Sequence, residues 1–123
     1  VGVRGMRMLA ARMEKLAADD PRSVDFIGHV VRMQEEIGTG GAGFRFIYAG
    51  FLQEAADLLG KPQLTRMSER LIEIGDNWRA FALKAARMVK GREAVDPGRL
   101  ASMLRALSQE EEAFFRDLKA AVA

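Results

Sequence analysis

The sequence contains no cysteine among its 123 residues. Disulfide bonds, thiolate metal sites and a cysteine nucleophile are therefore excluded within this chain. It also contains a single histidine, His29, for which a structural role is the simplest interpretation. One histidine gives no convincing Ser-His-Asp set, and the Glu-x-x-His pairs of di-iron helical bundles do not occur. We therefore expect no catalytic residues, no metal and no cofactor in this chain.

Long apolar runs and clusters of one charge are also missing. No run approaches the roughly 18 residues that a membrane-spanning helix needs, and the N-terminal residues lack the apolar core and cleavage site of a signal peptide. The 19 basic and 17 acidic residues give a net charge of +2 and are interleaved along the chain, whereas nucleic-acid binders cluster their basic residues. These features predict a cytoplasmic protein with neither a membrane nor a nucleic acid as its partner.

Apolar residues recur at intervals of three and four positions along most of the chain, which is the pattern of amphipathic helices. Signals that start a helix occur at Asp20-Pro21, Pro62 and Asp96-Pro97, and Gly60 is suited to ending one. The sequence Ser108-Gln109-Glu110-Glu111 matches a capping box, which predicts the start of a further helix. Six helices are predicted, over residues 3–17, 21–37, 44–59, 62–90, 97–107 and 108–122.

These helices predict an all-α bundle in which residues 1–123 form one domain. Because the first residue is Val rather than Met, we expect the N-terminus to be a cut in a longer chain. A hairpin of residues 44–59 and 62–90 is predicted at its centre. The first helix of this hairpin has an apolar face of Phe44, Ile47, Tyr48, Phe51, Leu52, Ala55, Leu58 and Leu59. The second has a heptad-like seam of Leu64, Met67, Leu71, Ile74, Trp78, Phe81, Ala85 and Met88.

Some residues within these helices carry predictions of their own. Trp78 is predicted to anchor the core, with the lining of a pocket as the alternative. Gly50 and Gly75 interrupt strong helical patterns, and each is predicted to let another helix approach closely. The neighbouring carboxylates at residues 35–36 and 110–112 are predicted to lie on solvated helix faces.

The one glycine-rich segment is Gly38-Thr39-Gly40-Gly41-Ala42-Gly43. It matches G-x-G-x-x-G literally, but a dinucleotide fingerprint follows a strand, and residues 31–37 have the pattern of a helix end. No Gly-Lys-Ser/Thr follows, so the segment is not a phosphate-binding loop of the Walker type. Two interpretations stay open: a turn that needs positive φ angles, and a cradle for an anion.

The cradle interpretation depends on the helix that follows the loop. Free N–H groups at a helix start favour a negative ligand, such as a carboxylate or a phosphopantetheine phosphate. Arg45 could add a fork of donors. The candidate ligand-binding residues are Gly38, Thr39, Gly40, Gly41, Gly43, Arg45 and Tyr48.

The loop and the helix after it, GTGGAGFRFIYAGFLQEA over residues 38–55, resemble a known family. It is the uncharacterised helical domain found C-terminal to N-terminal domains like that of butirosin biosynthesis protein H. Further similar segments are Ala56-Asp57-Leu58-Leu59-Gly60, the Gly75-x-x-Trp78 step and Val3-Arg4-Gly5-Met6. The resemblance extends from residue 1 to about residue 90, and residues 91–123 are similar only in being helical.

The resemblance implies a companion domain of a papain-like cysteine acyltransferase or peptidase-like protein. The nucleophilic cysteine then belongs to the preceding half, and this chain is a non-catalytic accessory domain that shapes the substrate cleft, docks an acyl carrier protein or dimerises. One alternative is a stand-alone interaction module that forms a homodimer through the seam of residues 64–88. Another is a small-ligand-binding bundle with a cavity near Tyr48 and Trp78.

Overall fold

The computed structural model describes residues 2–36 and 41–123, and these residues form helices and no strand. The all-α prediction is therefore confirmed for this part of the chain. Asp20 and Asp96 cap two helices as predicted, since their carboxylates accept hydrogen bonds from the backbone N–H of Arg22 at 2.9 Å and of Arg99 at 3.0 Å. The elements are α1 (Gly2–Glu14), α2 (Pro21–Glu35), the short 3-10 helix η1 (Ala42–Phe44), α3 (Arg45–Leu59), α4 (Pro62–Val89) and α5 (Pro97–Val122).

The prediction of a separate sixth helix is wrong, because α5 runs without a break through the capping-box sequence. Ser108 does not cap a new helix: its hydroxyl donates to the carbonyl of Arg105 at 2.7 Å, within the same helix. Glu111 does not reach back to the backbone of Ser108, since its carboxylate bonds to side chains of other helices. Both residues are buried, so this sequence belongs to a packed helix interior.

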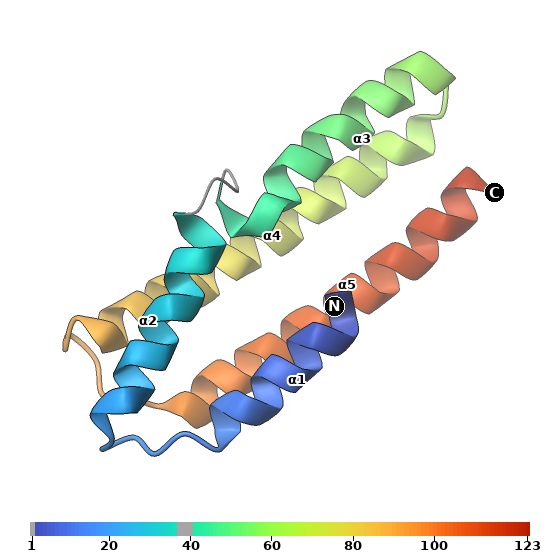
Figure 1. Cartoon of the computed structure of the whole chain (residues 1–123). Helices are drawn as coiled ribbons and strands as arrows, with labels where there is room; N and C mark the ends of the chain where they lie inside the picture. Colours follow the sequence, from blue (N-terminus) through green and yellow to red (C-terminus); the bar gives the residue numbers. More distant parts are fainter. Residues whose placement is uncertain (1, 37–40) are drawn as a thin grey trace.

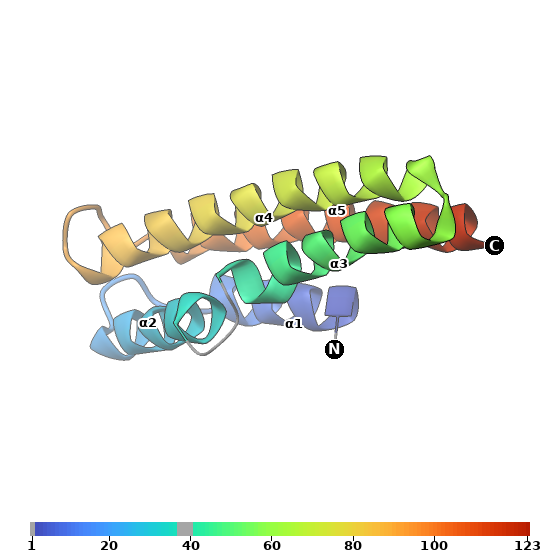
Figure 2. The same cartoon turned by 90° about the horizontal axis from the view of Figure 1, so that it is seen from above.

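The long helix α4 is the central element of the described chain. It contacts α2, α3 and α5, whereas α1 packs against α5. Figure 1 shows α2 and α3 side by side with successive parts of α4, and α1 alongside the first half of α5. The same arrangement seen from above places α1 and α2 below α5 and α4 (Figure 2). The predicted central hairpin is thus too narrow a description, since α3 covers only one end of α4.

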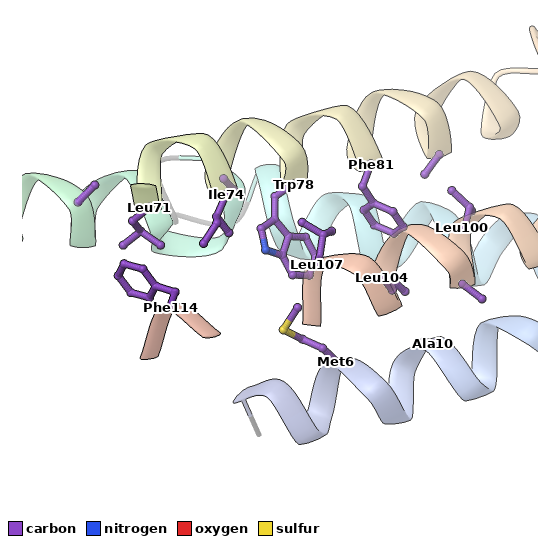
Figure 3. Close-up of a cluster of buried hydrophobic side chains, with 14 of the residues drawn as sticks. Met6, Ala10, Leu71, Ile74, Trp78, Phe81, Leu100, Leu104, Leu107 and Phe114 are labelled. Atoms are coloured by element: carbon purple, nitrogen blue, oxygen red, sulfur yellow. The ribbon is translucent and has the colours of Figure 1, made fainter. Parts of the chain in front are cut away.

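The core lies where α4 meets α5 and α1. Figure 3 shows Trp78 and Phe81 of α4 directed towards Leu104 and Leu107 of α5, with Met6 of α1 beside them. Trp78 is 5% exposed, which confirms it as a core anchor. All eight residues of the predicted seam are buried within the domain.

The two helix glycines have different surroundings. A Cβ atom on Gly75 would lie 2.6 Å from the ring of Phe46, so this glycine does let α3 pack closely against α4. Among the described residues, none lies within 4 Å of a Cβ atom placed on Gly50. The close approach predicted at Gly75 is therefore confirmed, and the one predicted at Gly50 is wrong.

Candidate functional site

The glycine-rich loop enters α3 through a left-handed turn. Gly38, Thr39 and Gly40 lie outside the described residues. Gly41 and Gly43 have φ angles of 84° and 54°, as a turn that needs glycine predicts. Ala42 and Phe44 also have positive φ angles, of 52° and 72°. A bulky residue rarely adopts this conformation, which costs on the order of 1–3 kcal/mol, and here it leaves the Phe44 side chain 56% exposed.

The described part of this loop already faces an anion that belongs to the chain. The backbone N–H of Ala42 donates to the two carboxylate oxygens of Glu35 at 3.3 and 3.4 Å. A Cβ atom on Gly41 would lie 3.2 Å from one of these oxygens, so a larger residue would crowd the carboxylate as well as strain the backbone. Glu35, predicted to be solvated, instead helps to hold the loop against α2.

Arg45 forms a buried network with two residues of α4 and α5. Its Nε and Nη2 atoms donate to the carboxylate of Glu111 at 3.0 Å each, and its guanidinium carbon lies 4.3 Å from the ring centroid of Trp78. The indole N–H of Trp78 donates to the same carboxylate at 2.5 Å. Arg45 Nη1 donates to the carbonyls of Ala42 and Gly43 at 3.4 and 3.2 Å.

This network ties the loop, α3, α4 and α5 together. The side chain of Glu111 is 4% exposed and that of Arg45 is 21% exposed. A bidentate pair with so little exposure, stacked on an indole, directs the Arg45 donors into the domain. The geometry favours the structural interpretation of Arg45. For Gly38, Thr39, Gly40, Gly41 and Gly43, ligand binding stays a prediction.

Sequence reasoning missed Glu111, which was predicted to be solvated with its neighbours. A signal was present in the sequence. When residues 97–122 are treated as one helix, Glu111 falls on the same row as Leu104, Leu107, Phe114 and Leu118, all of which are buried. An acidic residue on an apolar row indicates a buried partner for its charge.

Tyr48 belongs to an exposed apolar surface, which we call the α3 face: Phe44, Ile47, Tyr48, Phe51 and Leu58, with Phe115 of α5. The exposed fractions are 57% for Ile47, 61% for Phe51 and 84% for Leu58. Tyr48 is 40% exposed and makes edge contacts with Phe51 and Phe115, whose ring centroids lie 5.9 and 6.4 Å from its own.

The predicted packing face of α3 is thus wrong for its largest residues. The helix is buried through Ala49, Leu52 and Ala56, and the Ser68 hydroxyl of α4 donates to the carbonyl of Ala49 at 2.7 Å. Small residues let the two helix backbones lie close together, and the large apolar residues then point away from α4. The apolar arc of α3 is wider than a single neighbouring helix can cover.

Two hollows lie on either side of Phe44. One, of about 110 Å³, is lined by Tyr48, Leu71 and Phe115 among others. The other, of about 360 Å³, is lined by residues that include Leu9, Met33 and Trp78. The larger volume falls in the range of small-ligand sites, but the polar groups of Arg45 and Trp78 beside it already bond to Glu111.

His29 lies on the exposed surface of α2, so the structure does not give it a buried structural role. It lines a hollow of about 370 Å³ between α2 and the end of α4, together with Gly28, Val89 and other residues. Within residues 2–36 and 41–123, no group of three or more His, Asp or Glu side chains is placed to hold a metal ion.

A comparison with protein families matches residues 1–118 to a family described as a domain of unknown function, DUF4872. The chain belongs to this family. The match continues through most of α5, past residue 90, where the sequence resemblance became unspecific. Comparisons with curated proteins and with solved structures found no match. Of the helices in the described part of the chain, none combines the length and the apolar character needed to cross a membrane.

Proposed function

We propose that the chain is a non-catalytic accessory domain of a cysteine acyltransferase or peptidase-like protein related to butirosin biosynthesis protein H. Its preceding half would be a papain-like domain that carries the nucleophile. The accessory domain would act by association: it would shape the substrate cleft, dock an acyl carrier protein or dimerise. The resemblance over residues 38–55 supports the enzyme class, and the α3 face supports the associating role.

The α3 face is the observation that carries this proposal. A fully exposed large side chain has about 200 Å² of surface, so the exposed fractions of its six residues correspond to roughly 700 Å². The largest apolar patch on a typical monomeric protein is about 300–600 Å², and a standard interface covers about 800 Å² per partner. A surface of this size and composition is typical of a binding surface.

The test uses the complete protein encoded by the gene and measures acyl transfer from an acyl-thioester to an amine. We expect Phe51→Glu in the α3 face to lower the rate at least tenfold, because a charge there prevents association. The matched control is Leu83→Glu, at a residue of α4 that is 64% exposed and outside the α3 face, and it should keep the wild-type rate.

Two results would contradict the proposal. One is a preceding half that is fully active without this chain. The other is turnover of an acyl-thioester by this chain alone, abolished by a point mutation within it, because transfer needs an activated nucleophile with a base beside it.

A further inference from the structure

The α3 face extends onto the second half of α5. In Figure 1, α1 lies alongside the first half of α5, and α4 lies beside its second half. Phe115 and Val122, on this half of α5, are 44% and 51% exposed. The first half of α5 therefore packs against two helices, and the second half presents apolar side chains to solvent.

The two edges of this apolar region carry opposite charges. On α3, helical spacing places the exposed residues Glu54 and Asp57 along the side of the face that is remote from α5. On α5, Arg116 and Lys119 are exposed along the opposite side, next to Phe115, and Glu112 on the same side is paired with Arg7 of α1. The region thus has an acidic edge on α3, an apolar centre and a basic edge on α5.

This distribution is self-complementary in one orientation. If two copies meet face to face about a two-fold axis parallel to α3, the acidic edge of each copy lies on the basic edge of the other. If the two-fold axis lay in the plane of the interface but perpendicular to α3, the acidic edges of the two copies would meet. Like charges would then repel each other, which is unfavourable. The parallel arrangement places α3 of one copy over the second half of α5 of the other.

We propose that the occupant of the α3 face is a second copy of this chain, in an isologous dimer with the two α3 helices parallel. The inference rests on the proposed function, because it names the partner of the associating surface. The roughly 700 Å² on each copy approaches the 800 Å² that a standard interface covers per partner, and the charged edges fix the orientation.

The test measures the mass of this 123-residue chain by sedimentation equilibrium over a wide range of concentrations. We expect a dimer for the wild type and for Leu83→Glu, and a monomer with the same helical circular dichroism for Phe51→Glu. Reversing the acidic edge with Glu54→Lys and Asp57→Lys should weaken the dimer about tenfold or more, and so should Arg116→Glu with Lys119→Glu. All four changes together should restore it, because both edges are then exchanged.

A wild-type chain that stays monomeric, or a dimer that Phe51→Glu leaves intact, would overturn the second copy as the occupant. A dimer that the four combined changes fail to restore would overturn the parallel arrangement. These failures differ from that of the proposed function. The isolated chain could be monomeric while the complete protein still needs the α3 face for acyl transfer. In that case the accessory role holds, and the face binds a partner other than a second copy.

Discussion

The two ends of the α4–α5 pair are built differently. Around the end of α4 and the start of α5, α2 and α1 complete a four-helix arrangement whose side chains, such as Phe81 and Leu104, are fully buried. At the other end of the described helices α3 is added, and it leaves Phe51 61% and Phe115 44% exposed. The first end has a core closed by four helices, and the second carries the α3 face that we propose for association.

The two ends should differ most in stability when a phenylalanine is replaced by alanine at each of them. Phe81→Ala should lower the free energy of unfolding by about 3–5 kcal/mol, because it opens a cavity in a closed core. Phe51→Ala removes a side chain that is 61% exposed and should change stability by less than about 1 kcal/mol. Urea unfolding of both variants, at concentrations where the chain is monomeric, measures the difference, and equal losses would break the comparison.

The Arg45–Glu111–Trp78 network lies between the two ends. Breaking it should lower the free energy of unfolding somewhat less than Phe81→Ala does. Glu111→Gln leaves Arg45 without its counter-charge and should destabilise the domain by about 3 kcal/mol. The control is Glu112→Gln, whose carboxylate pairs with Arg7 where both side chains are about half exposed, and it should cost no more than about 1 kcal/mol. If thermal unfolding shows the same loss of stability for Glu111→Gln and Glu112→Gln, Glu111 is not the buried partner of Arg45.

Two glycine substitutions should have opposite signs. Gly75→Ala introduces a methyl group into the ring of Phe46 and should destabilise the domain by about 1–3 kcal/mol. Gly50→Ala adds a methyl group in open space and should stabilise it by roughly 0.5–1 kcal/mol, because alanine favours the helix. A stabilising Gly75→Ala would show that α3 does not lie close against α4.

The smallest expected effect is a lowered pKa of Asp20, which caps α2 at the four-helix end. The side-chain hydrogen bond from Arg22, followed by the bond from its backbone N–H, lowers the pKa of Asp20 below the ordinary 3.8. A lowered pKa in the folded state means that the carboxylate stabilises the fold above the ordinary pKa. This contribution is lost as the pH falls through the lowered value.

Nuclear magnetic resonance titration of the Asp20 carboxyl carbon measures this pKa directly. It should lie below 3.8 in the wild type and rise in Arg22→Ala, which keeps the backbone N–H but removes the side-chain donor. A wild-type pKa at or above the ordinary value would contradict the capping geometry.

Local signals were enough to predict much of the four-helix end. Asp20-Pro21 and Asp96-Pro97 start helices as predicted, and the seam of α4 is buried throughout. These features depend on residues close in sequence or on one helical row. The capping-box sequence at Ser108 gave a wrong prediction because contacts with other helices, above all with Arg45, determine where the Glu111 side chain points.

The other end, formed by α3, α4 and the second half of α5, could not be predicted in the same way. The apolar pattern of α3 is as regular as that of α4, and periodicity alone cannot say how much of an apolar arc a neighbour covers. Only the placement of Ala49 and Ala56 against α4 shows that Phe51 and Leu58 point away from it. Within the loop, the partner of the Ala42 amide is Glu35, seven positions earlier, for which no local motif exists.

The central claim is that the α3 face is covered in the complete protein. Hydroxyl-radical footprinting of that protein measures the solvent exposure of Phe44, Tyr48 and Phe51 against Leu83, which is exposed outside the face. The account predicts that the three aromatic residues are several-fold protected relative to their reactivity in Phe115→Glu, in which the added charge on the α3 face should prevent association, while Leu83 reacts equally in both. Aromatic residues that react equally in both proteins would contradict it, because the α3 face would then be open to solvent.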